Sequence, residues 1–184
     1  MANQVYKSSS DGVFKRSAML EQKSLLRTIL LHLIAILFVI FNISDIRISG
    51  LSNIVPLLDL MMIFYFAIFK RVFAVWFIFV LGIWNDALNG NPLGVTPLCY
   101  ILLIESFLVI NNRMLPKEEF QQVWQQFVIF CFLFLAMKWA ILSIFAVSFF
   151  DFKTPLIHLV LSSVLYVLMH RFFDYLSQKL LQEN

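Results

Sequence analysis

The longest apolar segment of the chain is residues 123–150, VWQQFVIFCFLFLAMKWAILSIFAVSFF. It contains a single charged side chain, Lys138. The hydrocarbon core of a bilayer is about 30 Å thick and is crossed by about 20 predominantly apolar residues in an α-helix. This segment is long enough to cross, so it predicts a membrane-spanning helix.

Other apolar segments precede and follow this one, separated by short breaks that carry charged residues, Asn, Pro or Gly. Thr96-Pro97 and Thr154-Pro155 each predict a helix that starts at the proline, with the threonine hydroxyl as its cap. We therefore expect an all-α, polytopic membrane protein with about six transmembrane helices. The predicted spans are 25–43, 54–69, 72–84, 97–110, 123–150 and 155–173.

The composition supports this class and excludes others. Of the 184 residues, 61% are hydrophobic and 14% are charged, whereas a soluble domain is typically about 45–50% apolar. The formal charge of +3 forms no basic stripe with interleaved aromatic residues, so we expect no nucleic-acid partner. Cys99 and Cys131 lie inside apolar segments without the spacing of a disulfide framework or a metal site, so we expect them to fill the core.

Basic residues predict one membrane domain with both termini in the cytoplasm. With the amino terminus inside, the inner segments hold eleven of the 14 Lys and Arg residues and the outer loops hold two. We expect residues 1–23 to be a disordered, basic cytoplasmic tail, 24–176 the single transmembrane domain, and 177–184 a cytoplasmic tail.

Four ionisable side chains lie in or at the edge of the predicted spans, namely Asp59, Asp86, Glu105 and Lys138. Each costs roughly 2.5–3.5 kcal/mol in hydrocarbon unless it has a partner or water. Glu105 and Lys138 lie at one depth, about 12 Å and about 13 Å from the outer edge of the core, which suggests an interhelical ion pair. The alternative is that each snorkels or faces a wet cavity independently. Either Asp59 or Asp86 could line an outward-facing cavity or bind a cationic partner group.

Glycine and proline gather between the third and fourth predicted spans, at Gly82, Gly90, Pro92 and Gly94. Irregular backbone near membrane depth requires protein or water around it. The segment is therefore either a tightly packed outer corner or part of a surface that binds a partner or substrate. Asp86, in the same segment, could simply cap a turn.

Enzyme motifs are missing from the sequence. There is no HExxH, GxSxG, P-loop or GxGxxG, and His32, His158 and His170 lie on separate segments. We predict a protein that is not an enzyme, with no catalytic, cofactor or metal site, although an intramembrane enzyme built from scattered residues stays open.

The order of features from Ile54 to Ile110, about a third of the chain, resembles the family of the rod shape-determining protein MreD. The features that carry the resemblance are Pro56, Asp59, Tyr65, the Lys70-Arg71 turn and Gly82-x-x-x-Asp86-x-x-x-Gly90-x-Pro92-Leu93-Gly94. The basic amino-terminal tail is longer than the resemblance leads us to expect.

The resemblance implies a non-enzymatic bacterial inner-membrane component of the cell-elongation machinery, which supports peptidoglycan synthesis along the side wall. Its partners would be MreC and, through it, MreB and the cell-wall synthases, and its fold would be similar to the substrate-binding subunits of energy-coupling-factor transporters. We expect contact on the outer corner and on the facing helix surfaces. The candidate partner-binding or structural residues of the corner are Gly82, Asp86, Gly90, Pro92, Leu93 and Gly94. The alternative is a substrate-binding subunit of a vitamin-type transporter, with Asp59, Glu105 and Lys138 lining the pocket.

Overall fold

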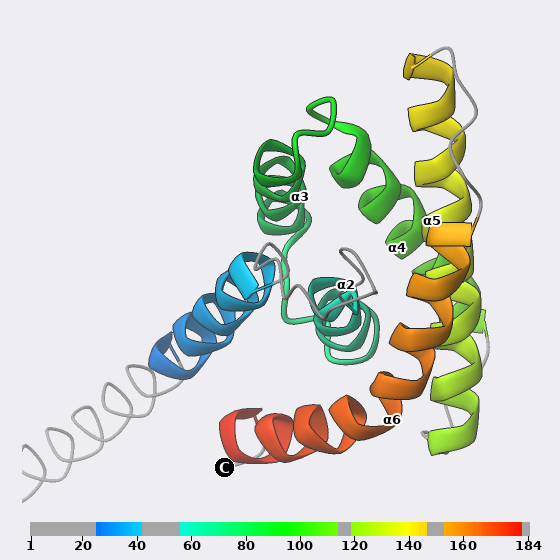
Figure 1. Ribbon diagram of the computed structural model, residues 1–184. Coiled ribbons are helices and arrows are strands. Elements are labelled where there is room, and N and C mark those ends of the chain that lie inside the picture. The colour runs from blue at the N-terminus through cyan, green and yellow to red at the C-terminus, as the bar shows by residue number, and fades with distance from the viewer. Residues whose placement is uncertain (1–24, 42–55, 114–118, 147–152, 182–184) are drawn as a thin grey trace, which may run out of the picture.

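The computed structural model of the protein describes residues 25–41, 56–113, 119–146 and 153–181, and helices without strands make up these ranges (Figure 1). The all-α prediction is confirmed. The helices are an N-terminal helix (Leu25–Phe41), α2 (Leu58–Ile63) with its π-helical continuation η1 (Phe64–Phe69), α3 (Val75–Asn89), α4 (Val95–Arg113), α5 (Phe120–Ala146) and α6 (Lys153–Leu181).

Each predicted span contains a helix, although several boundaries differ. Helix α3 continues five residues past Trp84 to Asn89, because Asn85 and Asp86 find partners inside the protein and need not face lipid. Helix α6 runs on to Leu181, into the segment that the sequence assigns to the carboxy-terminal tail. The described ranges contain two helices, α5 and α6, that are long and apolar enough to cross a membrane, together with four shorter apolar helices.

Helix α2 and its continuation η1 form the centre of the molecule, and the other helices surround them (Figure 1). Every residue from Leu58 to Ile68 is buried. A helix that is apolar on all sides must be covered on all sides, and here protein supplies that cover. Because neighbouring helices enclose it, this short helix does not depend on matching the full thickness of a bilayer.

The core around this central helix is built largely from phenylalanine. The Phe64 ring lies with its centroid 5.1 Å from that of Phe130 and 5.4 Å from that of Phe127, so η1 and α5 pack ring against ring. Such aromatic pairs add to the stabilisation from buried area. Cys99 and Cys131 are buried in the same core as free thiols, which confirms their interpretation as core-filling residues.

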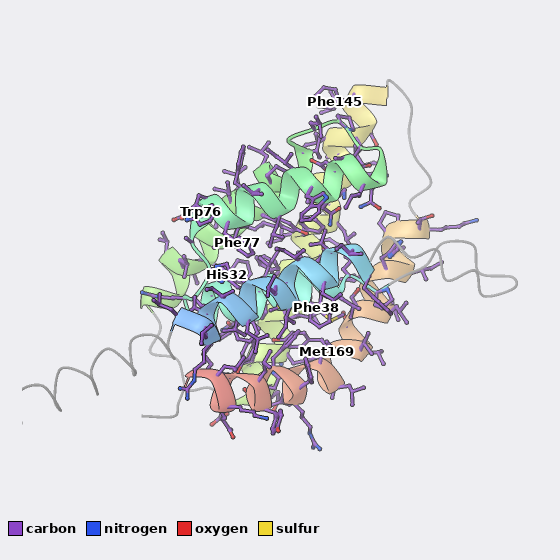
Figure 2. All side chains as sticks on the ribbon, turned by 90° about the vertical axis from the view of Figure 1, so that its left-hand side faces the viewer. His32, Phe38, Trp76, Phe77, Phe145 and Met169 are labelled. Atoms are coloured by element: carbon purple, nitrogen blue, oxygen red, sulfur yellow. The ribbon has the colours of Figure 1, made fainter. Side chains whose placement is uncertain are left out.

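Helix α6 bends partway along its length, so its two parts pack on different neighbours (Figure 1). The first part receives a hydrogen bond of 3.0 Å from the Trp124 indole of α5 to the Ser163 carbonyl. Its Ser162 hydroxyl accepts the backbone N–H of Leu57, at 3.1 Å, and so fixes the start of α2. The second part packs Phe173 against Phe38 of the N-terminal helix, which lies between α3 and α6 in Figure 2.

Candidate functional site

The turn between α3 and α4 is organised by the buried carboxylate of Asp86, in the last turn of α3. Its Oδ2 atom accepts hydrogen bonds from the backbone N–H groups of Gly94, at 3.0 Å, and Thr96, at 2.9 Å. Its Oδ1 atom accepts a third hydrogen bond from the Thr96 hydroxyl. Three donors compensate for the loss of water around the carboxylate. The interpretation of Asp86 as a residue that caps a turn is confirmed.

This arrangement corrects the predicted start of the fourth span. The sequence assigns Thr96 as the cap of a helix that begins at Pro97, but α4 begins at Val95. Thr96 therefore lies inside the first turn of α4, where its hydroxyl donates a hydrogen bond to Asp86. In the same way, α6 begins at Lys153, before Thr154 and Pro155.

Two glycines give the turn its backbone path. Gly90 ends α3 with a φ of 66°, and Gly94 precedes α4 with a φ of 104°. Both angles lie in the region that glycine adopts without the steric cost of a Cβ atom. These residues are therefore required by the geometry of the turn.

Gly82 permits a close crossing of the two helices below the turn. A Cβ atom added to Gly82 would lie 2.6 Å from the Cα atom of Pro97. The backbones of α3 and α4 are thus in direct contact, as small residues allow at helix interfaces in membranes. The predicted alternative of a tightly packed corner describes this part of the molecule.

Of the six corner residues predicted from the sequence, Pro92 and Leu93 direct exposed side chains away from the turn. Leu93 is 69% exposed, whereas Asp86 in the same turn is fully buried. The corner therefore has a buried part, in which Asp86 bonds to Gly94 and Thr96, and an exposed apolar part, Pro92 and Leu93, which we call the tip.

A second buried polar group lies beneath the corner, around Asp59 of α2. The Asp59 carboxylate accepts hydrogen bonds from the Asn85 side-chain amide of α3 and from the Tyr100 hydroxyl of α4, the latter at 2.7 Å. The side-chain amide of Asn89 adds a further hydrogen bond to this group by donating to the Asn85 side-chain oxygen, at 2.8 Å. Three helices are thus joined through one carboxylate. The sequence-based prediction makes neither Asn85 nor Tyr100 a partner of Asp59.

Lys138 approaches this group from α5. Its Nζ atom lies 5.8 Å from the centroid of the Phe134 ring, which stacks on Tyr100 with centroids 5.1 Å apart. The ammonium group interacts electrostatically with the carboxylates of Asp59 and Asp86. The structure therefore brings together Asp59 and Lys138 of the predicted charged network.

Glu105, the third member of that network, lies elsewhere. Its side chain is exposed, and within the described ranges no ion pair joins it to Lys138. Tyr100 points towards Asp59, and five further residues of α-helix turn the chain by about 140°. Equal depth, which motivated the predicted pair, does not determine the direction of a side chain around its helix.

A separate polar contact, not predicted from the sequence, joins η1 to the second part of α6. The Tyr65 hydroxyl donates a hydrogen bond to Asp174, whose other carboxylate oxygen lies 3.3 Å from Nε2 of His170. The only sequence signal was the spacing of four residues between His170 and Asp174, which places them on one helix face. In the described part of the chain no cluster of His, Cys, Asp and Glu is suited to hold a metal ion.

The chain matches the family model of the rod shape-determining protein MreD over residues 22–176. This match includes all the helices of the described ranges except the last residues of α6. No curated protein and no solved structure matches the chain.

Proposed function

Because the chain belongs to the MreD family of rod shape-determining proteins, we propose that it is a non-enzymatic inner-membrane subunit of the bacterial cell-elongation machinery. In this role it binds MreC, through which it connects to MreB and the cell-wall synthases, and it supports peptidoglycan synthesis along the side wall. The observation that carries the proposal is the family match over residues 22–176.

The polar groups of the site support a scaffold more than a ligand-binding subunit. The Asp86 carboxylate is occupied by three protein donors, and the Asp59 carboxylate is occupied by Asn85 and Tyr100. A vitamin-type transporter subunit would need polar groups left available for its ligand. Here they hold α2, α3 and α4 together instead.

The proposed membrane arrangement has six crossing helices and cytoplasmic termini. The distribution of Lys and Arg supports it, since Lys70 and Arg71 connect the second and third helices while the next connection, at the corner, carries no basic residue. The corner with Leu93 then faces the exterior, where it can meet the extracytoplasmic part of a partner.

Within the corner, the exposed tip is the part suited to contact a partner. Leu93 offers a large apolar side chain outside the packed turn. Replacing Asp86 would not test this contact, because its loss removes the acceptor of three hydrogen bonds and loosens the turn itself. The informative substitution is therefore Leu93→Ser.

Complementation of bacterial cells depleted of their own MreD tests the proposal. We expect the unsubstituted chain to restore rods and Leu93→Ser to leave rounded cells at equal membrane abundance. Ile144→Ser is the matched control, since Ile144 is 76% exposed on α5, outside the corner, and it should restore rods. Failure of the unsubstituted chain would contradict the role in elongation, whereas rods with Leu93→Ser would remove only the contact assigned to the tip.

A further inference from the structure

Glu105 is an exposed acidic residue midway along an apolar helix. It lies ten residues after Val95, about 15 Å along α4, whose 19 residues span about 28 Å. If α4 crosses the bilayer, Glu105 therefore meets the hydrocarbon near its middle. Charged side chains at that depth normally face the interior of a helix bundle or pair with another group.

The structure offers Glu105 no such partner in its described ranges, where it forms no ion pair and no hydrogen bond through its side chain. Lys138, the basic residue within a neighbouring helix, forms no ion pair with Glu105 in these ranges, and its Nζ atom lies 5.8 Å from the centroid of the Phe134 ring. As far as the described ranges extend, the exposed carboxyl group of Glu105 is available to a partner protein.

The residues around Glu105 form a surface suited to a second helix. Leu98, Leu102, Glu105 and Val109, which we call the Glu105 stripe, follow a spacing of four, three and four residues and so share one face of α4. The apolar members of the stripe are 48–55% exposed. Beside Glu105, the small side chain of Ser106 donates its hydroxyl to the Leu102 carbonyl at 2.7 Å, so it permits close approach without an unsatisfied polar group.

We propose that the Glu105 stripe binds a transmembrane helix of a partner protein, and that this helix presents Lys, Arg or another hydrogen-bond donor at the depth of Glu105. The inference rests on the proposed association with MreC for the identity of that helix. It deepens the association by assigning the membrane contact to one face of α4.

Charge complementarity favours a different protein over a second copy of this chain. A twofold symmetric pairing of two α4 helices would place Glu105 near Glu105. Two ionised carboxylates in that position would repel each other, and relief of this repulsion would require one of them to take up a proton. A helix with a donor side chain satisfies the carboxyl group and covers the apolar residues of the stripe.

Site-specific photocrosslinking in membranes tests the proposal with the full-length chain co-expressed with full-length MreC. A photoreactive residue in place of Leu102 should form a covalent adduct with the membrane helix of MreC. The matched control replaces Ile129 of α5, which is 54% exposed compared with 48% for Leu102. This control should give no adduct.

Substitution of Glu105 provides a second readout. Glu105→Gln keeps one acceptor and should weaken co-purification of MreC by roughly fivefold to thirtyfold, the range for one to two kcal/mol of interhelical hydrogen bonding. Glu105→Lys should abolish the Leu102 adduct, and exchange of the partner's donor residue for Glu should restore it.

The possible outcomes separate this inference from the proposed function. If MreC co-purifies but forms adducts from Ile129 and not from Leu102, the stripe is not the contact and the proposed function stands. Adducts at Leu102 between two copies of the chain would also overturn the inference. So would adducts at Leu102 with lipid alone, if MreC co-purifies. If MreC neither co-purifies nor forms adducts from any position, the proposed association itself fails.

Discussion

The hydroxyl group of Tyr100 on α4 donates a 2.7 Å hydrogen bond to the Asp59 carboxylate on α2, in a part of the protein where both side chains are buried. This bond links the central helix to the helix that carries the candidate partner surface. Any change that disturbs Asp59 is therefore expected to affect the position of α4.

Tyr100→Phe should lower the free energy of unfolding by about 1–3 kcal/mol, because it leaves a buried carboxylate without one of its donors. The measurement is thermal denaturation of the purified protein in a single detergent.

Tyr166→Phe is the matched control for this substitution. Tyr166 is also fully buried and stacked on a phenylalanine, Phe127, but its hydroxyl has no hydrogen-bond partner within the described ranges. Removal of the Tyr166 hydroxyl should leave the free energy of unfolding unchanged or raise it slightly. Equal losses for the two variants would show that the bond to Asp59 contributes nothing specific.

Gly82→Ala should destabilise the protein by about 1–3 kcal/mol, because the added Cβ atom forces the backbones of α3 and α4 apart. Thermal denaturation with the same detergent measures the loss. A Gly82→Ala protein as stable as the original would contradict the close crossing.

Gly90 should respond differently, because space is open around it and only its φ of 66° restricts the side chain. Gly90→Ala should cost about 1–2 kcal/mol, whereas Gly90→Asn should cost less, since asparagine tolerates this conformation. Gly82→Asn should be worse than Gly82→Ala. If asparagine were equally tolerated at both positions, the distinction between packing and backbone geometry would be wrong.

Cysteine labelling in intact cells measures the proposed orientation. Leu93→Cys should react with a membrane-impermeant maleimide added outside, whereas Lys70→Cys should react only after the membrane is opened. Cys99 and Cys131 are buried, so the unsubstituted chain serves as the unlabelled background. Reaction of Lys70→Cys with the maleimide in intact cells would place the Lys70-Arg71 turn outside and contradict the proposed orientation.

The positions of the helices could be predicted from the sequence because apolar segments alternate with breaks that contain Gly, Pro or charge. The corner was also predictable, since Gly90, Gly94 and Asp86 are residue types with specific turn geometries. In each case a local property of one segment determined the structure.

Relationships between helices could not be predicted in the same way. The depth of Glu105 follows from its position in the sequence, but its direction depends on how α4 is rotated against α2 and α5. The bond from Tyr65 to Asp174 depends on the bend of α6 and on η1, where the backbone N–H of Lys70 bonds to the Tyr65 carbonyl, five residues back. No residue pattern marks such a change of helix type.

Co-purification of MreC with the full-length chain, extracted from bacterial membranes in mild detergent, tests the proposed role most directly. Packing between membrane helices resists salt, because 1 M salt screens exposed charges beyond about 3 Å but does not reach a lipid-buried contact. We predict that MreC stays bound through a 1 M salt wash. Recovery of the chain without MreC, from cells where both proteins are abundant, would contradict the account.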